Sequence, residues 1–551
     1  MTALDEEALP PPCHPAKPLP FELVQHVGIF FEENLHTQAL NLLLNALSSH
    51  PDPSTPIFIP SPEHLALAAT ILVHPSTTAR PKTTEEQEAP SVSLRLLRLV
   101  NNHVGPINGN FSKAFRFKHF ERSRHGGRRH VDHAAENLET NSERDWNLDK
   151  NINIDLAQSA SVWSRAEDFW HAVGWAFNCA VLHPPRWKYW RIWLEFMCEV
   201  LEADWDERQR RHEENLSHDD QILEDSMIVN YINTSTAGSG RDRRILRAIF
   251  ADGGTSAVNE FREVFHRELK LSQKKADKEK DTRKRGAAVN IEAGEYGDFY
   301  LSTDHEDEGS SSGHGSKRPR RAAARARKDV GIATLDQAPN SVTPDPTLTS
   351  SLLGDICSLA LRQRLCHLLS TVSQFLPSSF MDLSDLYQLF VENIRPLPLP
   401  IYQAFVSPFT LPNFSAAAHS TLCEFLLYRL RESSAPDSKE EYLSQAKLEE
   451  CFLPFAAATP SLSDNAKMSI TLEALLILLA DSDMIEVTDE TKRLTKMGII
   501  RRAEKAQQET RKNQAAKMVD DRETSWLVES AERLTFLVES VIPSRATAES
   551  L

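Results

Sequence analysis

The chain has 551 residues, which is enough for roughly two or three domains. Its 62 lysine and arginine residues against 78 aspartate and glutamate residues give a formal net charge of −16, which argues against a protein whose whole surface coats nucleic acid. The seven cysteines form no CxxC pair and mostly fall within apolar helical patterns, which favours a reducing compartment over a disulfide-bonded secreted fold. The longest apolar run, residues 472–480, is too short to span a bilayer, so we expect no membrane partner.

The N-terminal part begins with an acidic, proline-rich stretch, residues 1–20, for which we expect a disordered tail without the features of a signal peptide. From residue 21 onward, apolar residues recur at intervals of three and four, the spacing of one helix face. This pattern predicts helices over residues 21–47, 62–73 and 91–104, within a helical region that extends over residues 21–271.

Phenylalanine alternates with arginine and lysine between residues 111 and 129. Such a mixture suits a nucleic acid, because aromatic rings stack on bases while cations contact phosphates. No known nucleic-acid-binding module surrounds the segment, so a basic surface loop tethered by its phenylalanines is the alternative. The nearby histidines match no zinc-site spacing, and we expect neither a metal nor another cofactor. The candidate nucleic-acid contacts are Phe115, Arg116, Phe117, Lys118, Arg122, Arg124, Arg128 and Arg129.

Seven of the nine tryptophans lie in the stretch from Val162 to Trp205. Apolar side chains recur there at helical spacing on both sides of a proline pair, which predicts a helical hairpin over residues 159–210. Most of the tryptophans fall on the two apolar seams and should form a core. Trp175 and Trp193 fall off the seams, so we expect them to face either a third element or a partner protein.

The second helix of this hairpin contains the sequence WRIWLEFMCEVLEADW. It resembles the half-a-tetratricopeptide class, whose repeats carry spaced aromatic residues and a glutamate. No second copy of the pattern recurs at a fixed period, so the resemblance covers this one helix and does not establish a repeat array.

Residues 272–347 have a different composition, rich in charge, glycine and serine and low in apolar residues, for which we expect a disordered linker. Compact clusters of lysine and arginine are typical of nuclear localisation signals, which bind import receptors. A solvated charged linker is the alternative interpretation. The candidate localisation residues are Lys274, Lys275, Arg283, Lys284, Arg285, Lys317, Arg318, Arg320 and Arg321.

An acidic stretch with aromatic residues lies between the two basic clusters. Tyr296, Phe299 and Tyr300 are candidates for a docking motif that folds when it binds a partner. Ser302 and Thr303 precede acidic residues, so they are candidate phosphorylation sites that would add to the negative charge.

The C-terminal part, residues 348–545, again shows apolar residues at helical spacing, interrupted by prolines. Its last long stretch, residues 491–541, predicts one or two helices whose charged, alanine-rich middle projects into solvent or pairs with another helix, as in a coiled coil. With no sustained alternation typical of strands, the sequence predicts an all-α fold: an irregular solenoid or bundle of helical hairpins in two regions, with a long disordered central insert.

For function, the leading hypothesis is a non-enzymatic nuclear scaffold or adaptor subunit that binds other proteins, working in a chromatin or genome-maintenance complex. The second hypothesis is direct DNA or RNA binding, including RNA processing, through residues 111–129 and the basic clusters. An enzyme is disfavoured, because the sequence contains no HExxH motif, phosphate-binding loop or recognisable Ser/His/Asp order.

Overall fold

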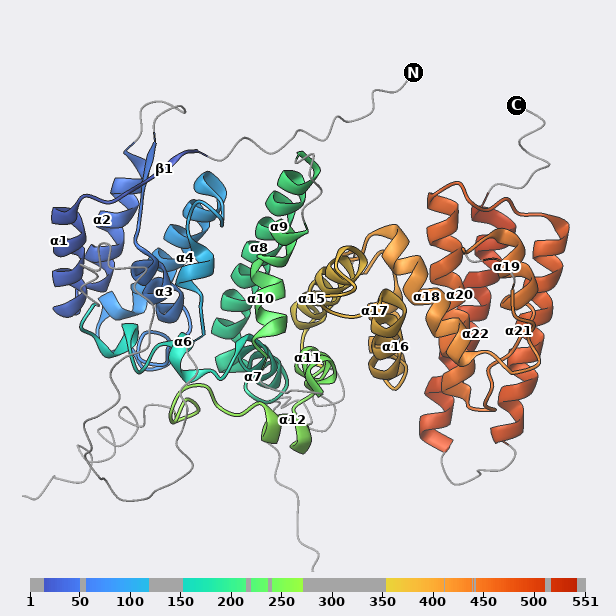
Figure 1. Ribbon diagram of the computed structural model, residues 1–551. Helices are drawn as coiled ribbons and strands as arrows, with labels where there is room; N and C mark the ends of the chain where they lie inside the picture. The colour runs from blue at the N-terminus through green and yellow to red at the C-terminus, as the bar shows by residue number, and fades with distance from the viewer. Residues whose placement is uncertain are drawn as a thin grey trace, which may run out of the picture. The chain divides into compact units, whose positions relative to one another are not determined.

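The computed structural model describes residues 14–49, 56–117, 152–214, 220–235, 240–270, 353–410, 412–438, 440, 442–510 and 517–542. Within these ranges the regular structure is almost entirely helical, and the helices pack in two regions, one before and one after residues 271–352 (Figure 1). The prediction of an all-α fold in two helical regions is therefore confirmed. Residues 1–13 of the predicted N-terminal tail and the whole predicted central linker, residues 272–347, lie outside the described residues. Residues 14–20 are described, and the expectation of a disordered tail is wrong for the strand at Ala16–Pro18.

The described part of the first region opens with the short strand β1 (Ala16–Pro18), which pairs in parallel with β2 (Ile57–Ile59) further along the chain. Strands of three residues are too short for an alternating pattern to be visible in the sequence, so spacing does not predict them. Two helices, α1 (Phe21–Glu32) and α2 (His36–Ser48), lie between the two strands in the chain. The helices after β2 are α3 (Pro62–Ile71), α4 (Thr84–Val104) and α5 (Phe111–Ala114).

The tryptophan-rich stretch forms a short helix, α6 (Val162–Arg165), and then two long ones, α7 (Phe169–Leu182) and α8 (Pro184–Glu214). Acceptor side chains cap the N-termini of the first two of these helices: Ser161 Oγ accepts from the Trp163 N–H of α6, and Asp168 Oδ1 accepts from the His171 N–H of α7. His183 alone separates α7 from α8, because Pro184 starts the second helix where its missing N–H does no harm.

In the described part of the first region, a 3-10 turn before α6 packs on α3, and four shorter helices after α8 pack on α7 and α8. Gly174 of α7 permits a close approach, since a Cβ there would lie 2.3 Å from the ring of Phe261. Asn178 secures the same segment by donating to the carbonyl oxygens of Ala257 and Phe261. These elements are η1 (Asp155–Ala157), α9 (Gln221–Glu224), α10 (Met227–Asn233), α11 (Arg241–Ile249) and α12 (Thr255–Glu260).

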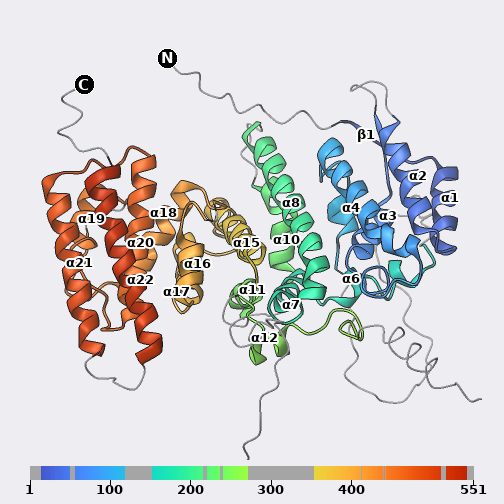
Figure 2. The ribbon, with the colours of Figure 1, turned by 180° about the vertical axis from the view of Figure 1, so that it is seen from behind.

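The second region contains α15 (Ile356–Phe375), α16 (Leu383–Ile394), α17 (Leu399–Val406), α18 (Ala416–Leu430), α19 (Gln445–Cys451), α20 (Leu462–Asp481), α21 (Asp489–Thr510), α22 (Lys517–Phe536) and the π-helical turn η4 (Leu537–Val541). The apolar helix α20 is nearly enclosed: it packs against α17, α18, α21 and α22 (Figure 2).

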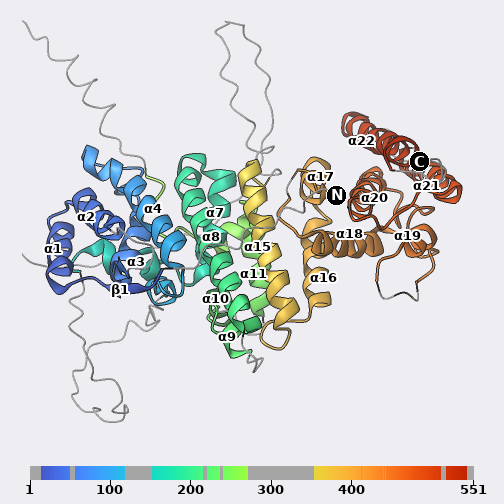
Figure 3. The same ribbon diagram turned by 90° about the horizontal axis from the view of Figure 1, so that it is seen from above.

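The two helical regions contact each other directly, with α15 packed on α8 and α11 (Figure 3). Arg362 of α15 is fully buried, and its guanidinium donates to the backbone carbonyls of Ile249 and Ala251 while lying 4.0 Å from the ring centre of Phe177. Burial lowers the pKa of Arg362 to about 9. Its hydrogen bonds and the ring contact compensate part of the cost of burying the charge.

Candidate docking site

Trp175 and Trp193 are buried, with exposed fractions of 2% and 0%. Trp193 lies among other aromatic rings, 5.5 Å from Trp190 and 6.1 Å from Trp163 between ring centres. Trp175 instead faces a third element, because its Nε1 donates to Glu268 Oε2 over 3.0 Å. The structure therefore contradicts the proposal of an exposed docking face at these two residues, since neither side chain is available to a partner.

Glu268 is the buried acceptor around which this part of the core is arranged. Its Oε1 accepts from Trp190 Nε1 at 2.6 Å and from Arg186 Nε at 2.8 Å, while Oε2 accepts from Trp175. Arg186 also donates to Thr78 Oγ1 and to the carbonyl of Val73. A buried ion pair is tolerated only when its remaining donors and acceptors are satisfied, which this arrangement achieves.

Residues just before and just after the segment 271–352 are hydrogen-bonded to side chains of α7 and α8. On the incoming side, Glu268 accepts from Trp175 and Trp190. On the outgoing side, Asp355 begins α15 and accepts from Trp187 Nε1 over 3.0 Å. The tryptophan-rich pair of helices therefore fixes both points between which the central segment is inserted.

The aromatic part of the candidate nucleic-acid segment is also packed into the core. Phe115 is fully buried, stacks on Trp163 with ring centres 4.9 Å apart, and offers its carbonyl to the Tyr231 hydroxyl. Phe117 is half-buried and contacts the same Trp163 ring edge-on. These two rings are not available to stack on bases, which contradicts that part of the prediction. Arg116 is exposed.

The remaining candidate residues lie outside the described residues. They are Lys118, Arg122, Arg124, Arg128 and Arg129 from the basic and aromatic segment, Lys274, Lys275, Arg283, Lys284, Arg285, Lys317, Arg318, Arg320 and Arg321 from the basic clusters, and Tyr296, Phe299, Tyr300, Ser302 and Thr303 from the acidic stretch.

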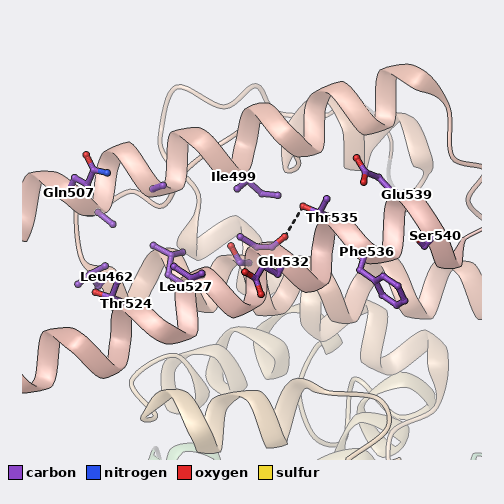
Figure 4. Close-up of a pocket in the computed structure, with 15 residues that line it drawn as sticks. Leu462, Ile499, Gln507, Thr524, Leu527, Glu532, Thr535, Phe536, Glu539 and Ser540 are labelled. Carbon is purple, nitrogen blue, oxygen red and sulfur yellow. Dashed lines mark hydrogen bonds between the residues drawn. The ribbon is translucent and has the colours of Figure 1, made fainter.

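A surface groove of about 820 Å³ lies between α21 and α22 and extends to η4, with α20 beneath it (Figure 4). Its walls are mostly apolar and its floor comes from α20. The α21 wall consists of Ile499, Ala503, Ala506 and Gln507, the α22 wall includes Leu527, Val528, Ala531 and Phe536, and the floor consists of Leu462 and Ser469.

The groove presents apolar surface to solvent, since Val528 is 51% exposed and Phe536 is 61% exposed. Among the described residues that line it, the only charged ones are the carboxylates Glu532 and Glu539. Ser469, which also lines the groove, is buried, and its hydroxyl has no hydrogen-bond partner in the described part of the chain. Sequence spacing predicts the helices here but not the groove, because the gap depends on how three separated helices pack.

Within the described ranges, no three or more histidine, cysteine, aspartate or glutamate side chains are grouped so as to hold a metal ion. No helix in the same ranges has the length and apolarity needed to cross a membrane.

Comparison with known proteins identifies no relative: the chain matches no protein-family model, no curated protein and no solved structure.

Proposed function

We propose that this protein is a non-enzymatic nuclear scaffold or adaptor subunit that binds other proteins through its helical surfaces. The observation that carries the proposal is the groove between α21 and α22, which leaves Val528 and Phe536 exposed beside other apolar side chains. Contiguous exposed apolar surface usually marks a site where another molecule binds. A complex acting on chromatin or in genome maintenance is the setting that this proposal favours.

The nuclear part of the proposal rests on the basic clusters of the sequence. Residues 274–285 and 317–321 each combine several cations within a short span, as import receptors require.

Fluorescence microscopy of the tagged full chain tests the localisation. Replacing the lysines and arginines of both clusters with alanine should move the protein to the cytoplasm, because the import receptors lose their cationic ligands. A control variant should instead replace exposed cations of the helical body, such as Lys113, Arg116 and Arg429, and stay nuclear. An unchanged nuclear signal after loss of both clusters contradicts the proposal.

Direct nucleic-acid binding is the less well supported alternative, because Phe115 and Phe117, the two candidate aromatic contacts within the described residues, are packed against Trp163. Phosphate contacts by cations give a steep dependence of affinity on salt. A salt titration with single-stranded DNA and RNA therefore separates the two functions. Absence of binding at low salt supports an adaptor, whereas tight binding with a steep salt slope supports the alternative.

A further inference from the structure

We propose that the groove between α21 and α22 binds an amphipathic helix of a partner protein, with lysine or arginine along the edge of that helix. The inference rests on the proposed adaptor function and specifies the chemistry of the partner. Binding of an apolar helix face in a hydrophobic groove is a common form of protein recognition.

The shape of the groove favours a helix as the occupant. Two long helices, α21 and α22, form its walls, and both pack on α20, which supplies the floor. The small side chains Ala503, Ala506 and Ala531 leave space along the walls. A further helix in this position would complete a bundle with the three present, burying its own apolar face against theirs.

The charge of the groove favours a basic edge on that helix. Glu532 is exposed and has no ion-pair partner among the described residues. Glu539 lies 2.7 Å from the ammonium of Lys496, so part of its charge is already compensated. No lysine or arginine is found among the described lining residues. Complementary charges at the edge of an interface select partners and fix their orientation.

The same charges disfavour a second copy of this chain as the occupant. In a symmetric dimer the same surface of both copies meets, so each Glu532 would approach the carboxylates of the other copy. Like charges placed opposite each other oppose association. An amphipathic helix from a different protein would cover the apolar walls with its apolar face and place its basic residues beside the carboxylates at the edge.

The test measures binding of a labelled, designed peptide to the purified full chain by fluorescence anisotropy. The peptide is about 18 residues long, with leucines at helical spacing and lysines beside them. Its twin has glutamate in place of every lysine. We expect the basic peptide to bind, the acidic twin to bind at least about fivefold more weakly, and Ala531→Trp to abolish binding by filling the groove.

Two variants of equal charge change locate the site. Glu532→Lys should weaken the basic peptide about fivefold, whereas Glu504→Lys should leave it unchanged, because Glu504 is exposed on α21 but does not line the groove. Equal effects of the two substitutions, equal binding of the two peptides, or binding that survives Ala531→Trp would each overturn the proposal. So would a concentration-dependent dimer in sedimentation that Val528→Arg abolishes.

Failure of this proposal is distinguishable from failure of the adaptor function. If the peptides do not bind but the tagged chain stays nuclear and co-purifies with other subunits in fixed proportion, the groove assignment alone is wrong. If the basic peptide binds in the groove but the chain is cytoplasmic, the proposed nuclear function is wrong.

Discussion

The carboxylate of Glu268 holds together parts of the chain that are far apart in sequence. It is 1% exposed and accepts from Arg186, Trp175 and Trp190. Removing one partner of a buried ion pair leaves the other charge without compensation, which costs more than the pair itself contributes.

Replacing Glu268 with glutamine should therefore lower the free energy of unfolding by about 3–5 kcal/mol, because Arg186 keeps its charge but loses the counter-charge. Chemical denaturation measures the change. The matched control is Glu199→Gln, which interrupts the ion pair of Glu199 with Arg98 on a partly exposed surface. We expect that control to cost below about 1 kcal/mol. Equal losses of unfolding free energy in the two variants would show that the buried Glu268 ion pair contributes no more to stability than the exposed one.

His64 predicts a dependence of stability on pH. Burial lowers the pKa of His64 from 6.5 to about 4. The unfolded chain therefore binds a proton between these two values that the folded chain does not bind, so folding stability falls as the pH decreases through this range. Between about pH 7 and pH 5, His64 alone should account for a loss of about 2 kcal/mol.

The measurement is urea denaturation of the wild type and of His64→Gln at both pH values. The variant should lose about 2 kcal/mol less than the wild type when the pH is lowered. His26→Gln, which changes an exposed histidine of α1, should behave as the wild type does. The same loss in the wild type and in His64→Gln contradicts the assignment.

At the level of single residues, the sequence predicts which side chains recur at helical spacing and form the core. It does not predict which groups form hydrogen bonds with the polar atoms buried there. The tryptophans of α7 and α8 are predictable as a core from spacing alone. Trp175 and Trp193 fall off the seams, and their burial depends on elements that pack from elsewhere in the chain. Glu268 gives no signal in the sequence, since a lone glutamate after an apolar stretch is usually exposed.

At the level of elements, the tightest packing at any glycine among the described residues is where α21 crosses the segment before α20. A Cβ on Gly498 would lie 1.8 Å from the carbonyl oxygen of Leu453. In α1, by contrast, nothing lies within 4 Å of the position that a Cβ on Gly28 would occupy. Gly498 is therefore required by the close contact with Leu453, whereas packing places no such requirement on Gly28.

Gly498→Ala should therefore destabilise the protein by about 3 kcal/mol, because α21 must move away from Leu453 to admit the methyl group. Gly28→Ala should stabilise it by about 0.5–1 kcal/mol, because alanine is the better helix former. Thermal unfolding followed by circular dichroism compares both with the wild type. Stabilisation by both substitutions would show that the backbone contact at Gly498 carries no cost.

The helices themselves are largely predictable, but their ends are less so. Residues 21–47 show one continuous apolar pattern, yet the chain breaks it after α1, where Asn34 adopts a positive φ of 60°. Asparagine tolerates this conformation better than most residues, which is a weak local signal. The helix predicted over residues 91–104 begins earlier, since α4 starts at Thr84 and contains Pro90. Packing of α4 on α2 and α3 overrides the local preference there.

At the level of the whole molecule, the two helical regions are joined by contacts as well as by the central segment. Arg362 reaches the carbonyls of Ile249 and Ala251, and Arg364 forms an ion pair with Glu202 at a distance of 2.5 Å. These contacts connect α15 with elements that precede residues 271–352 in the chain. The sequence does not predict whether the two regions pack together. The spacing of apolar residues shows that a helix has an apolar face, but not which other helix covers that face.

Cutting the chain within residues 272–344 should consequently leave the two fragments associated. A protease site engineered there, followed by size-exclusion chromatography after cleavage, measures this association. Arg362→Met should weaken it, because the buried carbonyls of Ile249 and Ala251 in the other fragment lose their donor. Arg429→Met, at an exposed arginine of α18, is the control. Fragments that separate without any substitution would show that the peptide connection is required.

The concentration of tryptophan in α6, α7 and α8 has an optical consequence. The seven indoles from Trp163 to Trp205 are buried, while the described part of the second region carries only Trp526. Intrinsic fluorescence therefore reports mainly on the first region, whereas far-ultraviolet circular dichroism reports on helices throughout. Denaturation curves from the two signals coincide only if both regions unfold together. Their separation under destabilising conditions would reveal the order in which the regions unfold.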